Sequence, residues 1–369
     1  MKRKVWLGLF GLTILVNVVA WNSRQFCDWH VKHLFPAAVN GYGRLTSLFP
    51  FSVGEWMIAL GLLLLLEAVL LGIVRLFVRR EWVKLLCRGY YRAFAWILLA
   101  VFMVMTWNCF ILYHASKFDE KYMPERAAKG YTNQELALVR DHIVEQLNEL
   151  SNLMERDEDG YLVYTGQVTQ EAIVAMQKLG EEYGQLAGYY PRAKIIRASD
   201  LLSQEYMMGY YFPFSMEANY NGRMYVVNMP STICHELAHL KGFIFEDDAN
   251  FIGFLACITS DDPFFRYSGY MGVLSYVERE FLNSIGHNAS LYAEHPGIAD
   301  QVYGDDLFLT AEAWEEVEEK AVVDTEVVKK ASNQFTEATL KINGVEDGMK
   351  SYGRVVQLLL EYYDGILYG

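Results

Sequence analysis

The residues best suited to chemistry lie in one short segment, His235-Glu236-Leu237-Ala238-His239, which is an HExxH motif. On a helix, residues four apart share a face, so both imidazoles can reach one metal ion. The glutamate that follows the first histidine is then aimed at a water on that metal. The motif predicts a zinc-dependent hydrolase that uses Glu236 as general base, because bound Zn²⁺ lowers the pKa of its water from 15.7 to about 7. A pair of buried histidines on a core helix is the alternative.

A catalytic zinc ion needs a third protein ligand, and acidic residues follow the motif at positions 246–248. They could instead form an acidic cap at a helix N-terminus. The stretch Glu246-x-x-Ala249-Asn250 resembles the ExxAD stretch of the CAAX prenyl protease family of membrane metallopeptidases. That resemblance implies Glu246 as the third ligand, with Asp248 as the fallback. It also implies that Asn250, in place of the Asp, orients a ligand histidine by a hydrogen bond.

Other parts of a peptidase site carry weaker signals. Tyr267 and Tyr270 are the candidates for donating a hydrogen bond to the oxyanion, ahead of His287. The stretch 219–228 is a candidate strand that could pair with a peptide substrate, or else simply pack as a sheet edge. Cys234 and Cys257 flank the motif and are expected to be small core residues rather than a disulfide or further ligands.

Helical patterns dominate the chain around these residues. Thr132 and Glu135 form a capping-box pattern before a helix at 133–150, and Thr310 is a predicted cap for a helix at 311–340. Further helices are predicted at 170–186, 231–241, 246–259, 270–284 and 352–363, and short strands at 194–198 and 223–228. The prediction is a mainly α (α+β) zincin-like domain with a small sheet.

Three nearly continuous apolar segments, 5–21, 56–78 and 93–113, are each close to the length that spans a bilayer. The first could also be a signal peptide, but two further spans favour an uncleaved anchor. Lys and Arg gather before the first span and between the second and third, which predicts that these ends face the cytoplasm. Residues 1–113 are therefore predicted to form three transmembrane helices, residues 114–130 a linker, and residues 131–369 an extracytoplasmic domain.

The formal net charge of -13 divides into +8 for residues 1–113 and -21 for residues 114–369. An acidic domain without a basic stripe argues against a nucleic-acid partner. Glu67 lies within the second apolar segment, where a hydrogen-bonded carboxyl is favoured over an ion-transport site. An intramembrane protease is not favoured, because Lys241 and the acids after it crowd the motif with charge.

The whole chain resembles a bacterial membrane family known as domain of unknown function number 3810. The resemblance rests on the three apolar segments and on the following motifs: Gly209-Tyr210-Tyr211-Phe212-Pro213-Phe214, Glu217-Ala218-Asn219, the HExxH with Gly242-Phe243, the stretch 246–251, and Arg266-Tyr267-Ser268-Gly269-Tyr270. It implies a zincin-like metallopeptidase domain. The sequence thus predicts a multi-pass protein of the bacterial inner membrane, in contact with lipid, that cleaves peptides or proteins of the cell envelope. The alternative is an inactive zincin-like protein that binds or senses an envelope partner.

Overall fold

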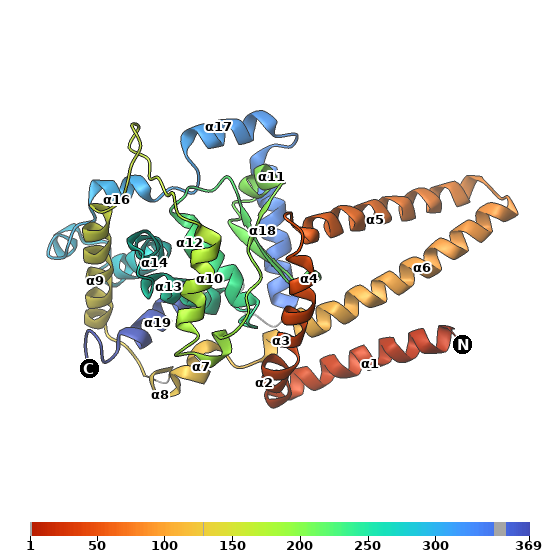
Figure 1. The fold of residues 1–369 in the computed structure, drawn as a ribbon, viewed down its shortest axis with the longest axis horizontal. Helices are drawn as coiled ribbons and strands as arrows, with labels where there is room; N and C mark the ends of the chain where they lie inside the picture. Colours follow the sequence, from red (N-terminus) through yellow and green to blue (C-terminus); the bar gives the residue numbers. More distant parts are fainter. Residues whose placement is uncertain (1, 128, 343–351) are drawn as a thin grey trace. The chain divides into compact units, whose positions relative to one another are not determined.

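The computed structural model describes residues 2–127, 129–342 and 352–369, and these residues form a mainly helical protein with a small sheet (Figure 1). They divide into two compact units, each described here by itself. One unit comprises Met1–Ala115 with Phe212–Glu217, and the other comprises Ser116–Tyr211 with Ala218–Gly369.

The first unit contains three helical segments that are long and apolar enough to cross a membrane, Arg3–Asn22, Val53–Phe77 and Glu81–His114. Its elements are α1 (Lys2–Asn22), α2 (Arg24–His33), α3 (Phe35–Ala38), α4 (Arg44–Thr46), α5 (Val53–Phe77) and α6 (Glu81–Met105). The helix α6 begins twelve residues before the predicted third span, since no proline interrupts 81–92 and Lys and Arg are good helix formers. The basic residues predicted to lie in a loop are therefore mostly on α6.

The short segment Phe212–Glu217 belongs to this first unit although it lies far along the chain. The buried carboxylate of Glu217 accepts hydrogen bonds from the backbone N–H groups of Val53 (3.2 Å) and Gly54 (2.7 Å). These N–H groups open the helix α5 and have no partner within it, and the helix dipole favours an anion there. Glu217 therefore caps one of the membrane-spanning candidates.

The second unit is helical apart from one sheet, and its main elements follow in chain order. They are α7 (Phe118–Tyr122), α8 (Pro124–Ala127), α9 (Asn133–Ser151), α10 (Val168–Leu179), β1 (Lys194–Ile196), α11 (Ser199–Gln204), β2 (Gly209–Phe212), β3 (Glu217–Asn221), α12 (Asn228–His239), α13 (Glu246–Ile258), α14 (Pro263–Ser284), α15 (Ala289–Tyr292), α16 (Asp300–Asp305), α17 (Ala311–Lys320), α18 (Thr325–Ile342) and α19 (Tyr352–Tyr363). The core forms where α13 packs on α12 and α14, and α14 packs on α9.

Two predicted caps are present, and one predicted helix is divided. Thr132 and Glu135 form the capping box of α9, and the Thr310 hydroxyl accepts a hydrogen bond from the Ala313 N–H at the start of α17 (3.2 Å). The predicted helix 311–340 is broken between α17 and α18, where the carboxylate of Asp324 caps the new helix by accepting the Glu326 N–H (3.0 Å).

The segment predicted to be a linker is instead helical and packed. Phe118 of α7 is fully buried, and its ring contacts Phe251 with the ring centroids 5.4 Å apart. Its backbone N–H donates to a carboxylate oxygen of Asp248 at 3.0 Å. The Phe118 ring is buried, and its N–H finds an acceptor, only because α7 folds against α13. The helix α7 therefore belongs to the second unit.

The sheet has the strand order β1-β3-β2, with β3 buried in the centre and parallel to β1. The predicted strand at 223–228 is wrong: residues 223–227 form turns and a bend, and Asn228 begins α12. Pro230 explains the difference, because proline favours the first turn of a helix and cannot donate to a ladder. A central strand has no free edge, so β3 cannot take up a peptide, whereas β2 lies at an edge.

Candidate metal centre

The metal motif lies on α12, and its predicted partners lie at the start of α13. Between the two helices, Gly242 adopts φ +89°, the left-handed conformation expected after the second histidine. Gly253 of α13 allows the helices to approach, since a Cβ there would lie 2.9 Å from the Ser231 carbonyl oxygen and 3.3 Å from the His235 nitrogen. This close crossing brings residues 246 and 250 beside the histidines.

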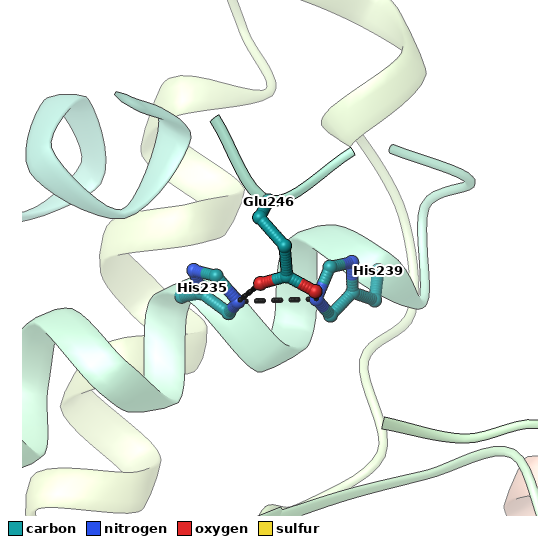
Figure 2. Close-up of side chains that lie close together, drawn as sticks. All are labelled: His235, His239 and Glu246. Carbon is teal, nitrogen blue, oxygen red and sulfur yellow. Dashed lines mark hydrogen bonds and ion pairs between the residues drawn. The ribbon is translucent and has the colours of Figure 1, made fainter. Parts of the chain in front are cut away.

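His235, His239 and Glu246 point toward one another and form a group that could hold a metal ion (Figure 2). The two Nε2 atoms are 3.1 Å apart, and the Glu246 carboxylate lies 3.1 Å from Nε2 of His235 and 3.9 Å from Nε2 of His239. All the candidate ligand atoms fall within 4.8 Å of one another. The three residues that the sequence singled out as ligands are therefore assembled by the fold.

The outer nitrogens of both imidazoles are engaged by acceptors. Nδ1 of His235 lies 2.8 Å from Oδ1 of Asn250, and Nδ1 of His239 lies 2.7 Å from the carbonyl oxygen of Phe243. An acceptor at Nδ1 places the proton there, which leaves the lone pair on Nε2. The two Nε2 lone pairs and the Glu246 carboxylate then face one point. These groups repel one another unless a cation lies between them.

The pKa values of His235, His239 and Glu246 also indicate that a positive charge is favoured at this centre. Burial lowers the pKa of His235, but the Glu246 carboxylate outweighs burial and raises it to about 9. Burial together with the nearby positive His235 lowers the pKa of His239 to about 4. Burial alone would raise the pKa of Glu246, but its bond to His235 lowers it to about 2. The Glu246 carboxylate thus favours a positive charge at this centre.

Glu236 is buried beside this group, with only 4% of its surface exposed. Burial raises its pKa to about 8, and its Oε2 has no hydrogen-bond partner among the described residues. Gly209 of β2 lies against the carboxylate, since a Cβ at position 209 would sit 2.8 Å from Oε1. The carboxylate and the metal group line one cavity of about 640 Å³, and β2 supplies Gly209, Tyr210 and Tyr211 to its wall.

These features fit zinc. The donors are two imidazole nitrogens and one carboxylate, a ligand set typical of catalytic zinc, which keeps a position open for water. The unpartnered oxygen of Glu236 is the acceptor that such a water requires. Both histidines also have the outer hydrogen bonds that fix a ligand imidazole in its tautomer.

The structure does not bring the predicted oxyanion donors to the metal group. Tyr267 is fully buried, and its hydroxyl donates to Asp305 at 2.6 Å. Tyr270 packs against Phe254 in the core, and His287 is exposed beyond the end of α14. Tyr276, which the sequence reasoning missed, lines the cavity, and its hydroxyl accepts a hydrogen bond from Nδ2 of Asn250 at 3.3 Å.

Asp248, the alternative candidate ligand, makes other contacts and does not join the metal group. It ion-pairs with Arg354 of α19 at 2.7 Å and accepts the Phe118 N–H. Arg354 also pairs with Asp247 (2.5 Å) and with Asp119 of α7 (3.0 Å). Asp247 and Asp248 both lie in the first turn of α13. Arg354 therefore holds in place the turn that carries Glu246, the candidate third ligand.

Replacing Arg354 by leucine should therefore destabilise the protein by about 3–5 kcal/mol, because three largely buried carboxylates lose their partner. Chemical unfolding of the full chain measures the loss. The matched control is Lys178→Leu, which breaks the exposed pair with Asp261 and should cost less than about 1 kcal/mol. Equal unfolding midpoints for the two variants would contradict the assignment.

Replacing Asn250 by alanine should weaken zinc binding about 10- to 100-fold, because His235 loses the acceptor that orients its ring. Competition with a zinc chelator measures the affinity. Asn250→Asp keeps an oxygen acceptor at that position and should bind zinc close to the wild-type affinity. If alanine and aspartate bind zinc equally, Asn250 has no orienting role.

Fold and site together define a mainly helical protein with three helices long and apolar enough to cross a membrane and a His-His-Glu group that could bind a metal. The chain belongs to the family described as "Protein of unknown function (DUF3810)", whose model matches residues 30–360. The family resemblance seen in the sequence is thereby confirmed, and it assigns no activity. No curated protein and no solved structure matches the chain.

Proposed function

We propose that this chain is a membrane-anchored, zinc-dependent peptidase. The observation that carries the proposal is the convergence of two Nε2 lone pairs and a carboxylate on one point, next to a buried carboxylate with an unpartnered oxygen. His235, His239 and Glu246 are the proposed ligands, and Glu236 is the proposed general base.

A zinc ion held by His235, His239 and Glu246 would supply an activated water and a Lewis acid for the scissile carbonyl. Glu236 accepts the proton of the attacking water and returns it to the leaving amine. Its burial under β2 keeps bulk water away from the carboxylate and so preserves its basicity. Asn250 and the Phe243 carbonyl hold the two imidazoles in place throughout.

Tyr276 is the proposed donor to the oxyanion, because its hydroxyl lines the cavity next to the residue that orients His235. Tyr276→Phe should lower kcat about 10²- to 10³-fold with little change in KM, as for the loss of one oxyanion donor. Tyr267→Phe is the matched control for a tyrosine hydroxyl buried in the core, and it should affect stability rather than kcat. A normal kcat for Tyr276→Phe would assign the oxyanion to another donor.

A peptide is the proposed substrate because β2 is an edge strand that lines the cavity. An extended peptide can add to such an edge through main-chain hydrogen bonds and so pass over the metal group. This role replaces the one predicted for 219–228, which forms the central strand and a turn.

The proposed location is the bacterial inner membrane, with the metal centre outside the cytoplasm. Support comes from the Lys and Arg residues at the start of α1 and near the α5–α6 connection, because such residues are retained on the cytoplasmic side. Three spans then place the second unit on the opposite side, where peptides of the cell envelope are its proposed substrates.

Metal removal tests the proposal. The full chain purified in detergent should contain about one zinc per chain, and it should cleave peptides from a quenched-fluorescence library. A chelator should abolish cleavage, and added zinc should restore it. Absence of zinc would refute the metal centre, whereas bound zinc without cleavage would favour the inactive envelope-binding protein.

A further inference from the structure

The lining of the cavity around the metal group contains four acidic residues and, among the described residues, no Lys or Arg. Besides Glu236 and Glu246, its wall contains Glu205 and Asp306, neither of which is a candidate ligand. Two positive charges on a zinc ion would be balanced by Glu236 and Glu246 alone. The other two carboxylates then leave the cavity with a net negative charge.

Glu205 and Asp306 come from segments that meet in space. Tyr206, next to Glu205, stacks on Phe308 with ring centroids 5.6 Å apart, and Phe308 lies two residues after Asp306. Asp306 itself directly follows α16 and precedes Leu307, whose carbonyl oxygen accepts a hydrogen bond from Nδ2 of Asn228 at the start of α12 (2.7 Å). Both acids therefore belong to the same part of the cavity, toward the N-terminal end of the metal-binding helix.

Neither carboxylate has a partner in the part of the chain that the structure describes, whether by hydrogen bond or by ion pair. Burial raises the pKa of each. A cationic side chain does lie nearby: Nζ of Lys329 sits 3.9 Å from the centre of the Tyr206 ring and outside the cavity lining. Its position shows that a cation is accommodated next to this aromatic pair.

Glu236 also indicates that this cavity binds a ligand. That side chain is more than nine-tenths buried, lines the same cavity and has an oxygen without a partner in the described chain. Carboxylates that line a cavity without a cationic partner attract a positively charged group.

We infer that Glu205 and Asp306 form a subsite for a positively charged group of the substrate, an ammonium or guanidinium group. The inference rests on the proposed peptidase function, because it assigns the preferred substrate as a peptide with a Lys or Arg residue near the scissile bond. The two carboxylates select the substrate group by its positive charge.

Peptide binding to the full-length Glu236→Gln protein tests the subsite without hydrolysis. The probes are short N-acetylated fluorescent peptides that differ only in Lys, norleucine or Glu at one scanned position. The Lys peptide should bind about tenfold more tightly than norleucine at the preferred position, and the Glu peptide most weakly. Glu205→Gln and Asp306→Asn should each reduce this preference, whereas the surface variant Glu158→Gln changes net charge equally and should not.

The outcomes separate the two proposals. Equal binding of the Lys and norleucine peptides to the parent protein would overturn the subsite, and so would an undiminished preference in the Glu205→Gln/Asp306→Asn double variant once its melting curve shows a folded protein. If the Lys preference is present but the wild-type protein cleaves nothing, the subsite stands and the peptidase function fails. If the wild-type protein cleaves peptides without any charge preference, the peptidase function stands and the subsite fails.

Discussion

Replacing Glu236 by glutamine should leave zinc bound and lower kcat about 10²- to 10⁴-fold, the usual contribution of a general base. Glutamine has the size of glutamate, so it fits beneath Gly209, but its amide cannot take the proton of the attacking water. Zinc content should stay at the wild-type level, because Glu236 is not one of the three residues that converge on the metal position.

Stability provides a second readout for this variant. In the metal-free protein, Glu236 carries an unpartnered buried oxygen, and its raised pKa shows that burial disfavours its charge. A neutral amide removes that cost, so metal-free Glu236→Gln should melt no lower than metal-free wild type. Glu149→Gln, the same change on the exposed face of α9, is the matched control. Activity retained by Glu236→Gln would refute the proposed base.

Replacing His239 by alanine should remove one of three ligands and weaken zinc binding about 100-fold. The estimate follows from structural zinc sites, in which four protein ligands share a zinc-binding free energy of about 10–16 kcal/mol. Each ligand then contributes about 3 kcal/mol, which corresponds to about 100-fold in affinity. Hydrolysis should be lost together with zinc. A chelator competition assay measures the affinity on the full chain.

The melting temperature tests zinc binding by His239 without an activity measurement. Zinc at about a thousandfold excess over its Kd stabilises the wild type by about 4 kcal/mol, so zinc should raise its Tm. His239→Ala should show a much smaller rise at the same zinc concentration. His287→Asn is the control, since His287 is exposed, and asparagine tolerates its positive φ of 55°. Equal zinc in His239→Ala and wild type would refute the ligand assignment.

Local patterns in the sequence predicted the elements that carry the site. The i, i+4 spacing of His235 and His239 requires only a helix, and α12 supplies it. The three apolar segments and the Thr132 capping box are likewise local, because each depends on residues within one turn or one helix. Glu246, the candidate third ligand, lies seven residues after the motif, and the resemblance to the ExxAD stretch indicated it.

Other features had no local signal. The chain has 25 tyrosines, and only the packing of α14 places Tyr276 in the cavity and Tyr267 in the core. The helical packing of the segment predicted to be a linker likewise depends on a neighbour distant in sequence, Asp248. The break between α17 and α18 does have a local signal, the Asp324 cap, but it lies within an otherwise continuous helical pattern.

The sequence by itself therefore determined the candidate metal ligands His235 and His239, because helical periodicity fixes their spacing along one helix. Only the tertiary structure decided what surrounds them: the close crossing of α12 and α13 at Gly253, the edge strand beside Glu236, and the further acids that line the same cavity. These depend on contacts between segments up to about a hundred residues apart. Such contacts are set by the packing of whole helices and strands rather than by any pattern within one of them.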